Sequence, residues 1–514
     1  MPTTENVHGV DRVNRVDRVN RVDAVGHPEG RSRSDGTDRV QIFQVSTLYG
    51  AATVAAAIDA GQFGAPGHAR RLLLVANNAE VPETALRLDA MTGYERIATR
   101  FDEVVDWNEA VHPHHPSSWA PRPEESPLWQ RVFRTAWGLG TATVEVVVES
   151  IQVNPAKALA AVFAESAVHV YADGLMSYGP TRDELPQSIA CRIRRVLHLD
   201  LVPGLRPLLL TEYGVGAELV PDDAFRVVLR EIADAAGVTT GVTAGATAEV
   251  TAGATTGATT GATTGATTGV TTEVTAGATT GVAAGAAGGA EVLAAAVAAA
   301  PTALLLGQYL AVLGILTVEE EEDLHVRMLR GAAAAGHRSV VFKPHPTAPA
   351  SYSRALHEEA ARAGVTLTVL DGPLLAETFY ERCRPRLVVG CFSTALLTAA
   401  VYYGVPVARV GTGTVLARLT PYENSNRVPL TVVDHLVPDL EGGAEPAVPG
   451  GAPAGLAPLV RAVGYCMRPT AHPGLRAEAV RYLAEHRDDP AAALHFPAER
   501  LAELGLDAPA RARV

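Results

Sequence analysis

The chain has 514 residues, a formal net charge of −13 and 47% hydrophobic residues, so it is long enough for about two to four domains with large cores. The acidic balance disfavours a general nucleic-acid-binding protein, which would normally carry a basic face. The four cysteines are widely separated, which suggests neither a zinc site nor a disulfide framework and favours a reducing compartment.

Residues 1–39 contain the near-repeat VDRVNRVDRVNRVDAVG and no long apolar run. Valine at every third position matches neither the helix nor the strand period, so we predict a disordered tail. The same stretch lacks the apolar core of a secretory signal, and we therefore expect a cytoplasmic protein.

Residues 40–237 alternate short apolar runs with helical segments, which predicts an α/β domain with a parallel sheet covered on both faces. Its first unit is the strand QIFQVST, followed by an alanine-rich helix from Leu48, and a helix at Asp222–Ala236 closes the domain. The other expected strands lie at residues 71–76, 101–107, 144–149, 168–171 and 207–211.

Residues 238–300 are built from units such as GATT and GVTT, which offer few large apolar side chains to bury. We interpret them as a flexible low-complexity linker. The apolar run Val292–Val318 overlaps its end, but Pro301 and Gln308 interrupt it and no Lys or Arg flanks it closely. We therefore do not expect a membrane span there.

A second α/β domain is predicted at residues 301–440. Thr317 and the acidic residues after it predict a helix start, because a hydroxyl cap and negative charge both suit a helix N-terminus. Residues 441–514 are interpreted as a linker and C-terminal helices that pack back across the domains. Two Rossmann-like domains with a cleft between them form a GT-B-like architecture. The expected strands lie at residues 303–310, 338–342, 366–371, 386–390 and 405–410.

Polar residues follow three of these strands, at the sheet edge where open α/β folds bind ligands. Asp173 could act as a general base, and Gly174 beside it would let a ligand approach the backbone closely, although Asp-Gly is also a common turn. Ser393 and Thr394 open a helix, where free N–H groups favour an anion, although the same residues serve as ordinary caps.

The third group is the KPHP loop, Lys343-Pro344-His345-Pro346. Two prolines one residue apart stiffen the chain that carries the imidazole. Because histidine titrates near neutrality, His345 could donate to a phosphate oxygen, whereas the plainer interpretation is a solvated loop histidine. The rigid setting favours a positioned acid.

In chain order, QVSTLYGAA, YADGLMSYGP, FKPHPTAP and GCFSTALLTAA resemble the bacterial alpha-2,8-polysialyltransferase family, of actinobacterial type. The resemblance spans Val40–Ala236 and Thr302–Leu440. It implies a glycosyltransferase that moves sialic acid or a related nonulosonic acid from a CMP-activated donor to a glycan acceptor. It also implies an inverting, metal-independent reaction without a cofactor, polymerisation in polysaccharide biosynthesis, and peripheral membrane association through a lipid-linked acceptor.

The resemblance also implies roles for single residues. Asp173 would deprotonate the acceptor hydroxyl, and His345 would contact the donor phosphate and act as the general acid. Ser393 and Thr394 would bind the same phosphate. The remaining residues expected around the nucleotide are Gly174, Gly307, Gln308, Lys343 and Pro346.

One position departs from the family pattern. The paired acids of the family are reduced here, because residue 172 is alanine. A second carboxylate would then have to come from elsewhere, and Glu149 at the end of VEVVVES is the candidate. Two alternatives remain: a GT-B transferase or epimerase that uses a UDP- or GDP-sugar, and a noncatalytic relative that binds a nucleotide-sugar.

Overall fold

The computed structural model describes residues 39–237, 293–294, 296–345, 352–372 and 374–506. The predicted tail, except Arg39, lies outside these ranges. So do most of the predicted linker and Pro346 of the KPHP loop. The domain boundaries expected at residues 237 and 301 therefore stay predictions.

The first sheet has seven parallel strands in the order β3-β2-β1-β4-β5-β6-β7, with β4 at its centre and β1 between β2 and β4. Because all strands run the same way, their carboxyl ends share one edge of the sheet. The apolar residues of β1 are buried on both faces, as in a covered parallel sheet. The strands are β1 (Arg39–Val45), β2 (Arg70–Val75), β3 (Glu103–Asp106), β4 (Thr143–Glu149), β5 (Ala167–Ala172), β6 (Ile193–His198) and β7 (Gly216–Leu219).

Helices flank this sheet, and the first of them begins where the sequence predicts. The Thr47 side chain caps α1 by accepting from the Gly50 N–H at 2.9 Å. The helices of this N-terminal unit are α1 (Leu48–Asp59), α2 (Tyr94–Ala98), α3 (Trp107–Val111), α4 (Ser126–Ala136), α5 (Ala156–Val162), α6 (Gln187–Ala190) and α7 (Asp222–Ala235). Short 3-10 helices lie at η1 (Leu88–Ala90), η2 (Pro123–Glu125), η3 (Leu175–Tyr178) and η4 (Thr211–Tyr213).

The strand expected at residues 207–211 is wrong. This apolar run forms turns and the start of η4, and Leu210 takes a left-handed backbone with φ of 61°. Leu209 and Leu210 are buried in an apolar cluster of the N-terminal unit, and Leu208 packs against Gly464 of a C-terminal helix, so the run is buried without joining the sheet. The sheet instead continues past β5 with β6 and the edge strand β7, which carry arginine and glutamate, and Arg195 of β6 and Glu218 of β7 form an ion pair at 2.8 Å.

The second sheet has five parallel strands in the order β10-β9-β8-β11-β12. Its strands are β8 (Ala303–Leu306), β9 (Ser339–Lys343), β10 (Thr366–Val369), β11 (Leu387–Gly390) and β12 (Val407–Arg409). Its helices are α9 (Val318–Ala334), α10 (Tyr352–Ala363), α11 (Ala376–Cys383), α12 (Thr394–Tyr403), α13 (Thr412–Arg418) and α14 (Arg427–Leu436). The predicted cap of α9 is confirmed, since Thr317 and Glu320 form a reciprocal capping box.

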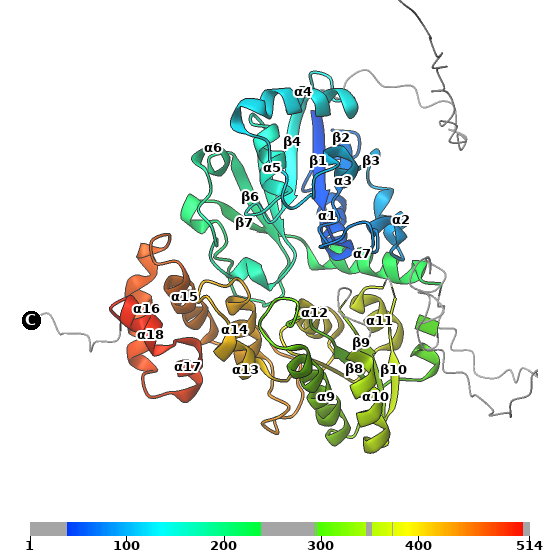
Figure 1. Ribbon diagram of the computed structural model, residues 1–514, viewed down its shortest axis with the longest axis vertical. Helices are drawn as coiled ribbons and strands as arrows, with labels where there is room; N and C mark the ends of the chain where they lie inside the picture. The colour runs from blue at the N-terminus through cyan, green and yellow to red at the C-terminus, as the bar shows by residue number, and fades with distance from the viewer. Residues whose placement is uncertain (1–38, 238–292, 295, 346–351, 373, 507–514) are drawn as a thin grey trace, which may run out of the picture.

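The last helices lie beside α13 and α14, and α15 among them contacts the N-terminal unit (Figure 1). Gly464 of α15 lies so close to Leu208 that a β-carbon there would sit 2.7 Å from the leucine side chain. These elements are α15 (Leu456–Met467), η5 (Pro473–Leu475), α16 (Arg476–Glu485), α17 (Pro490–His495) and α18 (Ala498–Glu503). No described helix is long and apolar enough to cross a membrane.

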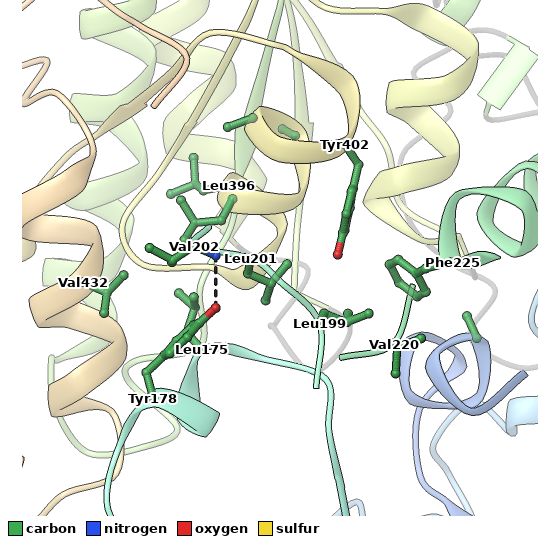
Figure 2. Packing of buried hydrophobic residues seen from close by; sticks show 14 of the residues in the cluster. Leu175, Tyr178, Leu199, Leu201, Val202, Val220, Phe225, Leu396, Tyr402 and Val432 are labelled. Atoms are coloured by element: carbon green, nitrogen blue, oxygen red, sulfur yellow. Dashed lines mark hydrogen bonds between the residues drawn. The ribbon is translucent and has the colours of Figure 1, made fainter. Parts of the chain in front are cut away.

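One apolar cluster extends through the junction of the two units (Figure 2). Leu175 and Tyr178 of η3 pack toward Leu396 of α12 and Val432 of α14. The Tyr178 hydroxyl accepts from the Val202 N–H at 3.0 Å, which anchors the ring within this cluster. The two sheets are therefore held against each other by a shared core, which fixes the geometry of whatever lies between them.

Polar contacts cross the same junction. The Tyr49 hydroxyl of α1 lies 3.2 Å from the Thr398 hydroxyl of α12. Arg382 of α11 donates to the Ala233 carbonyl of α7 at 2.7 Å. These contacts join the two units on the side of the junction marked by α7 and α11 in Figure 1.

Candidate active site

A cavity of about 570 Å³ opens at the junction, where the carboxyl ends of the two sheets meet. Its wall takes residues from the loops after β4, β5, β8, β9 and β11 and from the region around α14. It brings together seven of the residues that the sequence analysis proposed, namely Asp173, Gly174, Gly307, Gln308, His345, Ser393 and Thr394.

Asp173 stands beside a second carboxylate. Strands β4 and β5 are neighbours, and Glu149 pairs with Tyr171, two residues before Asp173. Glu149 and Asp173 both belong to the cavity wall. Burial, and then the negative charge of Glu149, raise the pKa of Asp173 to about 7. Burial also raises the pKa of Glu149, although the Ser46 hydroxyl donates to this carboxylate and opposes the shift. Glu149 thus lies beside Asp173 in the cavity wall, where residue 172 is alanine.

The amino-terminal turn of α1 lies against Asp173. A β-carbon on Gly50 would sit 3.1 Å from the Asp173 carboxylate and 3.1 Å from the Tyr171 hydroxyl. The Tyr171 hydroxyl donates its hydrogen to the Gln44 carbonyl at 3.1 Å. A side chain at position 50 would therefore force these groups to shift, so glycine lets the helix approach this carboxylate closely.

Gly174 makes the corresponding close approach between the two units. A β-carbon at this position would sit 3.1 Å from the Thr394 hydroxyl of α12. Asp173 therefore lies next to the amino end of a helix from the opposite unit. This contact is what brings a carboxylate and a potential anion site into one cavity.

His345 faces the cavity from the loop after β9. The Tyr309 ring stacks on its imidazole, with centroids 3.9 Å apart and planes 27° apart. Burial, and then the positive charge of Lys343, lower the pKa of His345 to about 4. The imidazole is therefore neutral at physiological pH while the cavity holds no anion.

Helix α9 supports the loop that carries Tyr309. The Gln308 N–H donates to the His325 ring at 3.1 Å. The Glu321 carboxylate accepts from the N–H groups of Leu310 and Ala311 at 2.9 and 2.8 Å. Since Glu321 and His325 are fully buried, they hold this loop, and with it the tyrosine ring, against the imidazole.

The stacked ring is expected to orient His345. Aromatic pairs contribute about 0.5–1.5 kcal/mol, so Tyr309→Leu should lower the turnover rate by about two- to tenfold. Tyr309→Phe keeps the ring and should retain most of the activity. Turnover and donor KM of both variants test this, and equal losses in the two would show that the hydroxyl acts rather than the stacking.

Ser393 and Thr394 lie at the amino end of α12, as the sequence predicts. The Ser393 side chain caps the helix by accepting from the Ala395 N–H at 3.2 Å. The capping interpretation is therefore correct, and it leaves the hydroxyl hydrogen of Ser393 free to donate into the cavity. A ten-residue helix that points its amino end at the cavity suits an anion, but phosphate binding there stays a prediction.

Lys343 does not line the cavity. Only 8% of the residue is exposed, and burial lowers its pKa to about 8 although the Asp371 and Glu377 carboxylates oppose the shift. Its expected contact with the nucleotide stays a prediction that the cavity wall does not support. The contact expected of Pro346 lies outside the described residues.

Several wall residues were not found from the sequence. Tyr309 directly follows Gly307 and Gln308 in the loop after β8, so the expectation that binding residues follow strands could have included it. Arg182 and Leu313 gave no signal, because they stand in loops without a motif, and Met176 lies within YADGLMSYGP, where nothing in the sequence distinguishes it from its neighbours. A separate cavity of about 650 Å³ lies at the carboxyl ends of β2 and β3, but its wall holds none of the proposed residues.

The sequence was compared with known proteins. The family model for alpha-2,8-polysialyltransferase (POLYST) matches residues 41–251 and 266–412. A search of curated proteins gives no match.

Similar solved structures include the sialyltransferase GT-B domain of Photobacterium damselae, with 11% identity, TM-score 0.37, and coverage of 76% of this chain and 95% of that one. The S. aureus MnaA–UDP structure shares 11% identity with TM-score 0.36, covering 83% and 96%. A putative UDP-N-acetylglucosamine 2-epimerase from Listeria monocytogenes shares 10% with TM-score 0.36, covering 85% and 98%. Since these TM-scores are below 0.5, only the family match carries weight.

Proposed function

This chain belongs to the alpha-2,8-polysialyltransferase family, and we propose that it transfers sialic acid or a related nonulosonic acid from a CMP-activated donor to a hydroxyl group of a glycan acceptor. The observation that carries the proposal is the placement of Asp173 and His345, from opposite units, in the wall of one cavity. Membership of the family makes the protein a sialyltransferase-like glycosyltransferase. The CMP donor, inversion and polymerisation belong to the proposal.

The proposed reaction is a single displacement. The Asp173 carboxylate accepts the proton of the acceptor hydroxyl while the acceptor oxygen bonds to the anomeric carbon of the donor. The bond from that carbon to the phosphate oxygen breaks, and CMP leaves with the electron pair. Attack on the face opposite the leaving group inverts the anomeric configuration, and the sugar passes through an oxocarbenium-like transition state.

The electrostatics of the cavity suit these roles. A base works best when its pKa lies near the working pH, and the pKa of Asp173 is about 7. The neutral His345 imidazole can donate an N–H hydrogen bond to the donor phosphate. A bound phosphate would also raise the pKa of this histidine, because a nearby negative charge favours the imidazolium. His345 would then be ready to protonate the departing phosphate.

The Glu149→Gln variant tests the paired carboxylates. The charge of Glu149 raises the pKa of Asp173, so its removal should lower that pKa. Asp173 must be ionised to act as a base, and the rise of kcat/KM with pH, centred near 7 in the native protein, should move to lower pH in the variant. A pH profile of CMP release with acceptor present measures the shift.

Glu145→Gln is the matched control. Glu145 lies on the same strand, outside the cavity wall, where it accepts from Gln41 at 2.9 Å. Its pH profile should equal that of the native protein. A profile for Glu149→Gln that is lowered at every pH without a shift would instead make Glu149 itself the base.

Nucleotide selectivity distinguishes the alternatives. Melting temperatures with CMP, CDP, UDP and GDP should rise most with CMP, because a ligand that binds only the folded state stabilises it. Preference for UDP or GDP would favour the other GT-B transferases or an epimerase. CMP binding without turnover would indicate a noncatalytic relative. Activity that persists in EDTA would support the metal-independent reaction.

A further inference from the structure

One arginine in the wall of the junction cavity has no part in the proposed reaction. Arg182 is the one Lys or Arg among the described residues of that wall. It belongs to the N-terminal unit, as Asp173 and Glu149 do, and lies in the loop between η3 and α6. His345 and Ser393, which are proposed to contact the donor phosphate, belong to the opposite unit. Arg182 therefore stands on the side of the cavity where the acceptor would meet its base.

The loop that carries Arg182 is fixed near the two carboxylates of the wall. The side-chain oxygen of Gln152 accepts from the Arg182 N–H and, at 3.3 Å, from the Asp183 N–H. Gln152 is itself a wall residue and follows Glu149 by three residues, so their Cα atoms are at most about 11 Å apart. The preceding Thr181 is only 1% exposed, which anchors the loop in the N-terminal unit. The backbone that carries the guanidinium is therefore held in place before a ligand binds.

The guanidinium keeps hydrogen-bond donors for a ligand. Its Nε donates to the Asp183 carboxylate at 3.2 Å, and neither terminal nitrogen has a hydrogen-bond partner among the described residues. The side chains of Arg182 and Asp183 are 41% and 54% exposed, and an ion pair this exposed contributes little. A planar guanidinium with two such nitrogens matches a carboxylate, which it can bind through two parallel N–H···O bonds.

An acidic acceptor sugar requires a cation in this cavity. An alpha-2,8 linkage forms when the 8-hydroxyl of a sialic acid attacks the donor, and that same sugar carries a carboxylate. Presenting the hydroxyl to Asp173 brings this charge toward the Asp173 and Glu149 carboxylates, which repel it. A positive charge on the same unit offsets the repulsion. Binding the carboxylate also orients the hydroxyl, because both groups belong to one sugar.

We propose that Arg182 binds the carboxylate of the terminal sialic acid of the acceptor and so holds the hydroxyl of that sugar toward Asp173. This inference rests on the proposed function and adds the residue that selects an acidic acceptor sugar. Hydrogen bonds to charged groups give effects of about tenfold or more, and the partial exposure of Arg182 favours the lower end of that range. Arg182→Gln should therefore lower kcat/KM for such an acceptor by about tenfold.

Matched acceptors test the inference. Acceptor-dependent CMP release from CMP-sialic acid is measured with sialyllactose and with its carboxamide, which lacks the charge but keeps every hydroxyl. We expect kcat/KM of the native protein for the acid to exceed that for the amide by about tenfold, and Arg182→Gln should bring this ratio close to one. Arg182→Lys keeps the charge without the planar fork and should give an intermediate ratio. Equal use of the two acceptors by the native protein would overturn the inference.

Arg206→Gln is the matched control. Arg206 is exposed on the same unit, outside the cavity wall, so this variant should keep the native ratio of acid to amide. If Arg182→Gln also kept the native ratio, or raised only the KM of the donor, Arg182 would not bind the acceptor carboxylate.

Two further readouts separate this inference from the proposed function. CMP release from CMP-sialic acid into water needs no acceptor, so its absence counts against the donor and not against the role of Arg182. The rise in melting temperature with sialyllactose or its carboxamide needs no turnover. A larger rise with the acid, lost in Arg182→Gln, supports the inference even then, and equal rises refute it.

Discussion

The His345→Ala variant is expected to lose transfer activity by about 10²–10⁴-fold while it remains folded. The imidazole faces the cavity at the end of β9, stacked on Tyr309, and alanine removes the N–H that would contact the donor phosphate. Without that donor, the developing negative charge on departing CMP is less stabilised. Because the side chain is half-buried in a loop, its removal should leave the sheet intact.

Release of CMP at saturating acceptor measures this loss, and circular dichroism checks the fold. His337→Ala is the matched control, since His337 lies at the amino end of the same strand and outside the cavity wall. It should keep activity close to that of the native protein. If His345→Ala retained more than about a tenth of the native rate, the imidazole could not be the general acid.

The Asp173→Asn variant should show a loss of similar size. Asparagine has nearly the same shape but cannot accept a proton from the acceptor hydroxyl, so the attacking oxygen is no longer activated. Removing the charge also relieves the repulsion from Glu149, which means that lost activity would not reflect lost stability. Donor binding should persist, because the nucleotide contacts proposed here, apart from Gly174, lie on the opposite unit.

Two measurements define this variant. The KM or Kd for the CMP-sugar should stay near the native value while kcat falls. Asp200→Asn serves as its control, because Asp200 follows β6 much as Asp173 follows β5 but does not face the cavity. Full activity in Asp173→Asn together with loss in Glu149→Gln would transfer the role of base to Glu149.

The sequence allowed the candidate site to be predicted because its residues follow a rule of backbone geometry. Asp173, His345 and Ser393 each come after a short apolar strand, and parallel strands bring such positions to one edge. Chain order and the family resemblance then connected the two sheets. The rule applies equally to Glu149, which ends β4 and was named as the alternative carboxylate.

Other features depend on contacts between distant segments. The stacking of Tyr309 on His345 requires two loops from different strands to meet, and no periodicity encodes that meeting. Lys343 is absent from the cavity wall, and its ammonium is buried near the Asp371 and Glu377 carboxylates, which partly offset the cost of burying its charge. The apolar run at residues 207–211 resembles a strand, but Leu208 packs against Gly464 of α15 while Leu209 and Leu210 are buried in the N-terminal unit outside its sheet.

The shared core at the junction limits how substrates enter and products leave the cavity. Leu175 and Tyr178 are packed with Leu396 and Val432, so parting the two units would expose this cluster to water (Figure 2). Every 100 Å² of apolar surface exposed costs about 2.5 kcal/mol, which makes a wide opening rare. Donor and product should therefore pass through the existing mouth, and the size of that mouth, rather than a hinge, would set which molecules enter.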